Sequence, residues 1–288
     1  MTRRAAALLG ITLVAAACQS GSTPSTEPAP SSAPVTASPA VRTTTAAPTT
    51  PAATTTIATT TIPPATAPPT TATPLVQELE IGRSVEGRPI TAIERGTPGG
   101  RAVLVIGCIH GDEDAGTAVV QQLMTAPVPD GVDLWLVPSM NPDGQAHQIR
   151  TNANKVDLNR NFPQNWGPLG EPGNSQYAGT GPASEPETAA IVALISRVKP
   201  ALAVWYHQDL NRIDVGSGRA GEIQRKYAEL TGLPVEPVTG GIYTGTATQW
   251  EAATVPRGIA FIVELGPTIE GDGAATHAGA VLTLASSS

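Results

Sequence analysis

Short apolar runs alternate along this chain with longer segments in which apolar residues recur every three or four positions. Runs bounded by Gly, Pro, Asn or Asp predict strands, and the periodic segments predict helices. The predicted strands lie near residues 76–82, 90–95, 102–109, 132–138, 201–206 and 259–265. The predicted helices lie near residues 114–126, 185–197, 219–231, 246–254 and 274–284. Strands that alternate with helices predict an α/β fold, with helices covering both faces of one sheet.

Local signals refine this pattern. Ser184 and Glu187 form a capping-box pattern, which predicts that a helix starts just after Ser184. Asp112 is placed to cap the helix expected from about residue 114, or to orient a neighbouring side chain. The stretch 139–183 is rich in Asn, Gly and Pro and is predicted to be mostly irregular. Long irregular loops inside a domain are usually functional.

The first 18 residues have the pattern of a secretory signal. Arg3 and Arg4 precede an apolar stretch that is too short to span a bilayer, and small residues precede Cys18. This cysteine resembles the lipidated residue of a bacterial lipobox, although Ala15 stands where such boxes usually carry Leu. We expect lipidation at Cys18 and a lipoprotein on the outer face of the cell membrane. An ordinary secretory signal with an incidental cysteine, and thus a secreted protein, remains the alternative.

The two segments that follow residue 18 differ from each other in composition. Residues 19–74 hold 12 prolines, no aromatic residue and only two charged residues, which predicts a disordered, semi-rigid spacer. Residues 75–288 are long enough for a single domain with its own core. They carry 23 acidic and 14 basic side chains, a net charge of −9 that argues against nucleic acid as a partner. Cys108 is the one cysteine after Cys18, so no disulfide is expected in this domain, and its thiol is expected to be buried. We also expect the protein to be a monomer.

Candidate metal ligands follow three of the predicted strands. His110 and Glu113 come after VLVIGCI, His207 follows AVWY, and Glu264 is the last but one residue of IAFIVEL. Imidazole and carboxylate are ligand types that Zn²⁺ favours, and open α/β sheets place their sites at the carboxyl ends of strands. A histidine after a strand is also often a structural residue, so the spacing alone leaves both interpretations open.

The long loop adds candidate substrate-binding groups. It contains Arg150 and the segment DLNRNF, with Asn159 and Arg160. A guanidinium beside an amide suits a carboxylate, and a second arginine could stabilise a developing oxyanion. Taken alone, the loop would favour the alternative, a solvated loop with ordinary surface arginines.

Taken together, His110-x-x-Glu113, Arg150, DLNRNF, His207 and Glu264 resemble the zinc metallocarboxypeptidase family in order and local sequence. The segments GRSVEGRPITAIERG, GPASEPET and FIVELGP add to the resemblance, which covers nearly all of residues 79–266. Within the family, the short bacterial branch that includes the murein tripeptide amidases is most similar. The resemblance implies a mixed, twisted β-sheet covered by helices on both faces, in a single catalytic domain.

The resemblance also implies roles. His110, Glu113 and His207 would bind one Zn²⁺ per domain, and Glu264 would be the general base that moves a proton from the attacking water to the leaving amine. Arg150 would stabilise the oxyanion, and Asn159 and Arg160 would hold the free carboxylate of the leaving residue.

Two further residues are weaker matches. Tyr243 would close over the substrate, although a tyrosine packed in a loop is the alternative, and Thr248 would tune the pocket for the leaving side chain. Residues outside the motifs are expected to be ordinary: His147 and His277 lie at the surface, and Asp157 shapes the loop.

The function predicted is a zinc-dependent metallopeptidase, a carboxypeptidase or amidase that hydrolyses a peptide bond next to a free carboxylate. A peptide or muropeptide is the expected substrate, such as one with the bond between γ-D-glutamate and diaminopimelate. A zinc acyl-amino-acid deacylase on a related fold, and a non-catalytic lipoprotein that binds cell-wall peptides, are the alternatives.

Overall fold

The computed structural model describes residues 75–237 and 239–287. The predicted signal, Cys18 and the linker 19–74 lie outside the described residues. The strands are β1 Leu75–Arg83, β2 Pro89–Gly96, β3 Arg101–Ile106, β4 Val132–Val137, β5 Leu202–Gln208 and β6 Ile259–Leu265. The helices are α1 Gly116–Thr125, α2 Pro142–His147, α3 Pro186–Val198, α4 Gly218–Thr231, α5 Ala247–Thr254 and α6 Gly273–Ser287, with a 3₁₀ turn at Leu158–Arg160.

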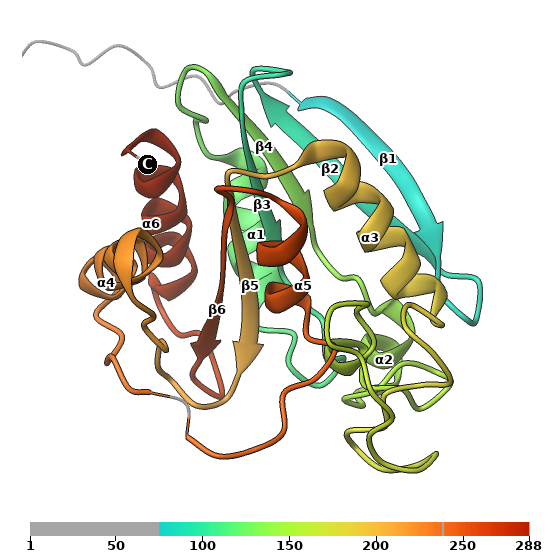
Figure 1. Cartoon of the computed structure of the whole chain (residues 1–288). Helices are drawn as coiled ribbons and strands as arrows, with labels where there is room; N and C mark the ends of the chain where they lie inside the picture. Colours follow the sequence, from blue (N-terminus) through green and yellow to red (C-terminus); the bar gives the residue numbers. More distant parts are fainter. Residues whose placement is uncertain (1–74, 238, 288) are drawn as a thin grey trace, which may run out of the picture. The chain divides into compact units, whose positions relative to one another are not determined.

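The six strands form one mixed sheet in the order β1-β2-β4-β3-β5-β6 (Figure 1). Neighbours among β4, β3, β5 and β6 pair in parallel, whereas β1 pairs with β2, and β2 with β4, in antiparallel fashion. The parallel strands therefore deliver their carboxyl ends to a common edge, where open α/β sheets bind their ligands. The predicted mixed sheet is confirmed.

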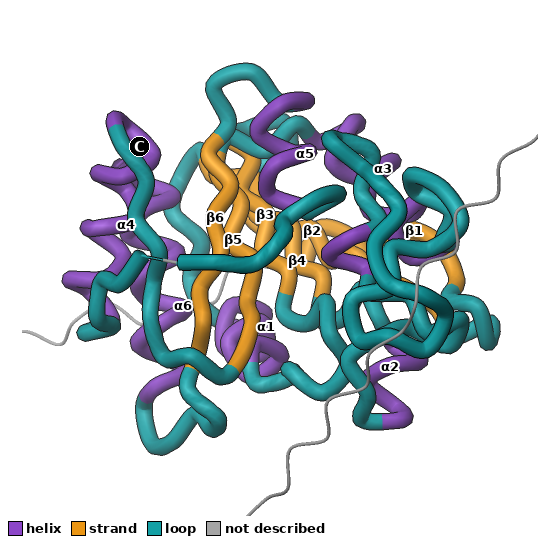
Figure 2. Tube along the Cα trace, turned by 60° about the horizontal axis from the view of Figure 1, so that its bottom comes forward, coloured by secondary structure: helices purple, strands orange, loops and turns teal. Residues whose placement is uncertain are grey.

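Helices cover both faces of this sheet, as predicted (Figure 2). Side chains of α1, α4 and α6 pack with one face in a core that includes Val120, Tyr227 and Val281. The other core lies under α3 and α5 and includes Ile191 and Trp250. Both faces of β5 are buried, and its successive residues alternate between the two cores.

The predicted and observed elements differ mainly at their ends. The apolar run of β3 continues beyond the strand, which ends at Ile106, because Cys108 and Ile109 are buried in the turn that follows. Burial raises the pKa of the Cys108 thiol to about 12, in line with the expected inert cysteine. The short helix α2 was not expected, since Pro142, Asp143 and Gly144 are typical of a turn.

Both helix-capping predictions are wrong. The cap position of α3 is Glu185, and its first turn has no side-chain cap; the Ser184 hydroxyl instead donates to Glu185. Helix α1 begins at Gly116 after Ala115, too far along the chain for Asp112 to cap it. His277 is also misplaced by the prediction, because it is buried against α4, whereas His147 is half exposed as expected. Among the described residues, no helix is long and apolar enough to cross a membrane.

Candidate active site

The turn after β3 carries the first two candidate ligands over the carboxyl edge of the sheet. A side chain at Gly111 would place its Cβ 1.9 Å from the carbonyl carbon of Gly144, so this close approach to α2 requires glycine. The Glu113 amide donates to the His110 carbonyl oxygen at 3.0 Å, which closes the turn. His110 is thereby held at 1% exposure and Glu113 points into the same space.

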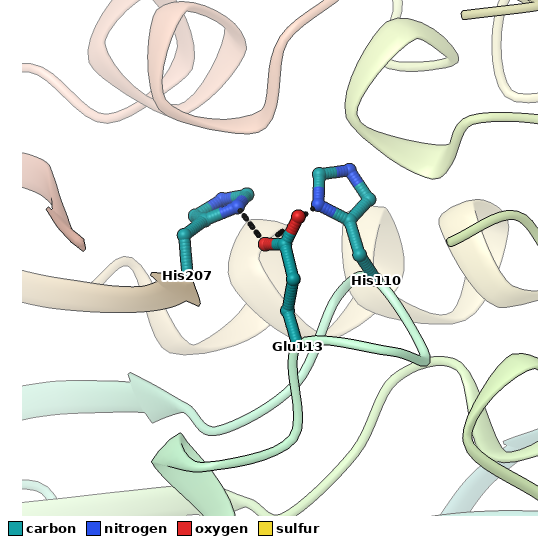
Figure 3. Close-up of side chains that lie close together, drawn as sticks. All are labelled: His110, Glu113 and His207. Atoms are coloured by element: carbon teal, nitrogen blue, oxygen red, sulfur yellow. Dashed lines mark hydrogen bonds and ion pairs between the residues drawn. The ribbon is translucent and has the colours of Figure 1, made fainter. Parts of the chain in front are cut away.

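Three side chains from two distant segments converge here (Figure 3). Glu113 Oε2 lies 2.9 Å from Nδ1 of His110 and 2.9 Å from Nδ1 of His207, which comes from β5. One ligand atom of each residue lies within 4.8 Å of the others, and the two imidazole rings meet edge to face. The arrangement therefore offers two nitrogen atoms and one oxygen atom as ligands for a single metal ion.

Asp157 contacts this cluster through a hydrogen bond with His110. His110 Nε2 donates to Asp157 Oδ1 at 3.0 Å, and Asp157 is fully buried. A carboxylate that accepts from one ring nitrogen fixes the tautomer and leaves the other nitrogen, here Nδ1, free to bind a metal. The prediction that Asp157 shapes the loop missed this contact, since its partner lies 47 residues away.

Arg150 links the two carboxylates. Its Nη1 donates to Glu113 Oε1 at 2.8 Å, while Nη2 donates to Asp157 Oδ2 at 2.9 Å. Burial opposes ionisation of Glu113, but the adjacent imidazoles hold the pKa of its carboxyl well below the usual range. The guanidinium is thus fixed beside the ligands, where a developing oxyanion would form; that role stays a prediction.

Glu264, near the end of β6, has different surroundings. Its Oε2 is buried and has no hydrogen-bond partner among the described residues. Burial, followed by the negative charge of Glu113, raises the pKa of the Glu264 carboxyl to about 7. A carboxyl group with a pKa near neutrality is suited to general acid–base catalysis.

The predicted carboxylate-binding pair lies beside helix α5. Asn159 Oδ1 accepts from the Ala247 amide at 3.0 Å, which fixes the side-chain amide. Arg160 donates from Nη1 to the Asn159 carbonyl at 2.8 Å, while its Nε is buried and has no partner in the described part of the chain. Its guanidinium lies 5.3 Å from the ring centroid of Tyr243, whose side chain is 46% exposed at the rim. The side chains of Asn159 and Arg160 are therefore oriented by these contacts, and each keeps hydrogen-bonding groups that can bind a ligand.

All of the predicted catalytic, binding and ligand side chains line one cavity of about 590 Å³. They are His110, Glu113, Arg150, Asn159, Arg160, His207, Tyr243, Thr248 and Glu264. The cavity wall also contains polar residues that the sequence did not single out, among them Arg212, Asp214 and Gln224. No motif marks these residues, because they come from the loop after β5 and from α4.

The donor set fits zinc. Catalytic zinc sites take three protein ligands of the imidazole and carboxylate type and keep one position open. His110, Glu113 and His207 supply such a set, with the Asp157 contact behind His110 typical of metal-binding histidines.

Comparison with known proteins agrees with this geometry. The model of the zinc carboxypeptidase family matches residues 70–209. Murein peptide amidase A of Escherichia coli K12 is 31% identical over 184 residues, which cover 59% of this chain and 74% of that protein. The structure of murein-tripeptide amidase MpaA from E. coli O157 superposes with a TM-score of 0.58 at 28% identity, covering 72% of this chain and 91% of that one.

A more distant structure shares the fold. Carboxypeptidase A from Helicoverpa armigera superposes with a TM-score of 0.61 at 18% identity, over 74% of this chain and 68% of that one.

Proposed function

Because the chain belongs to the zinc carboxypeptidase family and is a hydrolase of that type, we propose that it cleaves cell-wall peptides next to a free carboxylate. The bond between γ-D-glutamate and diaminopimelate is the proposed target. The observation that carries this proposal is the convergence of His110, Glu113 and His207 with Glu264 and Arg160 around one cavity. The names of the relatives, murein peptide amidases, support the choice of substrate.

Each cavity residue has a proposed task in this reaction. Arg160 and Asn159 bind the carboxylate of the leaving residue through charge-assisted hydrogen bonds and so position the scissile bond. A zinc ion held by His110, Glu113 and His207 would supply a Lewis acid that acidifies water and polarises the carbonyl.

Proton transfer and charge stabilisation fall to two further side chains. Glu264 takes a proton from the attacking water and passes it to the leaving nitrogen, a task suited to its raised pKa. Arg150 donates to the oxygen on which negative charge develops.

The experiment is a comparison of two substrates. Purified residues 75–288 would be incubated with a γ-D-glutamyl-diaminopimelate peptide and with an ordinary peptide with a free C-terminus, with and without a chelator. Chelator-sensitive hydrolysis, faster for the cell-wall peptide, is expected. Hydrolysis of neither substrate would contradict the proposal, and release of acetate from acylated amino acids would favour the deacylase alternative.

We further propose that the enzyme is an exported lipoprotein, and the support for this is the sequence of residues 1–18 with Cys18, followed by the Pro-rich linker. A fatty-acid label should enter the full-length protein and be absent from the Cys18→Ala variant. An unlabelled full-length protein would exclude lipidation.

A further inference from the structure

The edge of the sheet opposite the cavity carries the amino ends of the parallel strands. The arrowheads of β1, β5 and β6 point downward in Figure 1, so this amino edge lies at the top of that view. Arg101, the first residue of β3, pairs with Val132 at the start of β4. The Ala201 amide, just before β5, donates to the Ala102 carbonyl oxygen, and the Ile259 amide of β6 donates to the Ala201 carbonyl oxygen. The connections that enter β3, β5 and β6 therefore lie side by side.

Basic side chains gather on this amino edge. Lys199 precedes β5 and Arg257 precedes β6. The two connections touch, since a Cβ at Gly258 would lie 2.8 Å from the Pro200 carbonyl oxygen. Arg219, at the start of α4, has its Nη1 3.5 Å from the Arg257 carbonyl oxygen. We define the basic edge as four exposed side chains, Arg197, Lys199, Arg219 and Arg257.

The charges of the basic edge are not neutralised within the described part of the chain. The ion pairs of arginine and lysine side chains there involve other residues, and none includes a member of the basic edge. Arg197 lies over the ring of Trp135 at 5.2 Å, a contact that leaves its charge in place. Asp130 is the one acidic residue on the described connections that enter β3, β4, β5 and β6.

The cavity edge of the sheet has the opposite charge on its surface. The connections that leave β3, β5 and β6 carry four exposed acidic residues, Asp112, Asp209, Glu270 and Asp272. Arginines at this end, among them Arg150 and Arg160, line the cavity. A domain whose charges are separated in this way takes a preferred orientation at an anionic surface, with the basic edge towards it.

The chain that precedes the domain also joins it at the amino edge. β1 is antiparallel to β2, and β2 is antiparallel to β4, so β1 starts at the same edge as β4. Leu75 of β1 pairs with Arg95, and the next residue, Gly96, pairs with Asp133 near the start of β4. Residues 1–74, with the proposed lipid attachment at Cys18, are therefore connected to the edge that carries the basic side chains.

We propose that the basic edge binds the anionic headgroups of membrane lipids and so turns the cavity away from the membrane. Each basic side chain near an anionic membrane surface strengthens binding about fivefold, so four of them give a reversible contact that orients the domain. A lipid surface fits better than a soluble polyanion, because the segment with the proposed lipid attachment enters at this edge. The inference goes beyond the proposed hydrolysis and is tested without it.

The test uses the chain from residue 19 onwards, which contains every described residue but neither Cys18 nor the predicted signal. Binding is measured by co-sedimentation with vesicles of phosphatidylcholine alone, and with vesicles of phosphatidylcholine mixed with phosphatidylglycerol. We expect binding to the anionic vesicles only, and weaker binding at physiological salt than at low salt, because salt screens exposed charges.

Substitutions of the basic edge should weaken this binding. Lys199→Gln and Arg257→Gln should each reduce the affinity about fivefold, and the double variant about 25-fold. Lys155→Gln is the matched control, because Lys155 is also an exposed lysine with a positive φ, 62° against 50° for Lys199, but lies on the long loop after β4. It should bind as the unaltered chain does. Thermal melting of each variant shows whether it is folded.

Fluorophores at the two ends of β6 measure the orientation of the bound domain. Thr254→Cys and Thr268→Cys each replace an exposed threonine, one before and one after the strand. Cys108 is buried and escapes labelling. Energy transfer to a lipid labelled on its headgroup should be stronger from the Thr254→Cys variant than from the Thr268→Cys variant.

The inference would be overturned by absence of binding to anionic vesicles, by equal binding to both kinds of vesicle, or by equal losses in Lys155→Gln and Lys199→Gln. Stronger energy transfer from the Thr268→Cys variant would also overturn it. Binding to soluble polyphosphate without binding to vesicles would assign the basic edge to a soluble polyanion instead. None of these results bears on hydrolysis, which the peptide assay measures separately.

Discussion

Glu113 and Glu264 lie in the same cavity and burial acts to raise the pKa of both carboxyl groups, but their hydrogen-bond partners differ. Glu113 accepts from Arg150, His207 and the Gln208 amide, and its charge is offset by the groups around it. Glu264 keeps a buried oxygen that no described residue contacts through a hydrogen bond, and its pKa is raised to about 7. Neighbouring carboxyl groups whose pKa values are pushed apart are typical of sites that divide the work of catalysis.

Under the proposed mechanism, this difference separates metal binding, the role of Glu113, from proton transfer, the role of Glu264. A carboxylate that stays ionised over the whole physiological range is a dependable ligand, while one that titrates near neutrality can take up and release a proton. Replacement of Glu113 should therefore reduce metal binding, whereas replacement of Glu264 should reduce the rate of the reaction.

The largest effect is expected from Glu264→Gln, which keeps the shape of the side chain and removes its proton transfer. We expect kcat to fall by at least about 10³-fold, within the range for a lost general base, with zinc content unchanged. Steady-state kinetics and metal analysis measure the two properties. Glu251→Gln is the matched control, because Glu251 is also buried with a raised pKa, to about 8, but contacts Trp205 outside the cavity. Equal losses in both variants would contradict the assignment.

His277, a buried titratable residue outside the cavity, shows what a shifted pKa does where no catalytic role is proposed. His277 is hydrogen-bonded to the Tyr227 hydroxyl at 2.7 Å, and burial lowers the pKa of its imidazole to about 4. The unfolded chain binds this proton near pH 6.5, so stability is retained above that pH and falls as the pH drops towards 4. The expected loss is about 3 kcal/mol in the free energy of unfolding.

Denaturant titrations between pH 4 and 8 measure this loss. His277→Asn should be less stable at neutral pH and should lose most of the pH dependence in this window. His147→Asn, which changes an exposed histidine, is the control and should retain the wild-type profile. A wild-type slope in the His277 variant would show that other groups cause the acid sensitivity.

Asp157→Asn tests the metal-binding part of the comparison. Asparagine keeps the size but not the charge behind His110, so zinc affinity should fall about 10- to 100-fold, as is typical when a group behind a metal ligand is lost. Competition with a chromophoric chelator gives the affinity. Asp112→Asn, on the ligand turn, is the control, and an unchanged affinity in Asp157→Asn would argue against metal binding through Nδ1.

The smallest effect is expected at Tyr243. The ring lies over Arg160 at the exposed rim, where a cation–π contact contributes about 0.5–1 kcal/mol. Tyr243→Ala should therefore raise KM about two- to fivefold, and Tyr243→Phe should leave it unchanged. A large loss of kcat in Tyr243→Phe would instead assign the hydroxyl a part in the reaction.

The sequence predicted all six strands, because each carries apolar side chains that enter one or both cores or, in β1, pack against one of them. Five helices followed from apolar periodicity. Helix α2 was missed because its six residues include Pro, Asp and Gly, although Asn141 does cap it by accepting from the Gly144 amide at 3.0 Å. Local residue preferences could not separate a turn from one short helical segment.

Within the site, residues in motifs were easier to predict than residues that act through distant partners. Asp157 and His277 were assigned ordinary roles, because their partners His110 and Tyr227 are 47 and 50 residues away and no local pattern connects them. Arg212 was not singled out for the same reason. Its position in the cavity depends on pairing with β6, which is a property of the folded sheet.

The order of the strands also bears on protein synthesis. β6 is the last strand of the described chain to leave the ribosome, and it joins the sheet at an edge, where it pairs with β5 and forms one bridge with Arg212. A truncated product that ends before residue 259 would contain all three metal-binding side chains but not Glu264. It would also lack the side chains of β6 and α6 that form part of one core, so the last elements of the chain complete both the packing and the cavity.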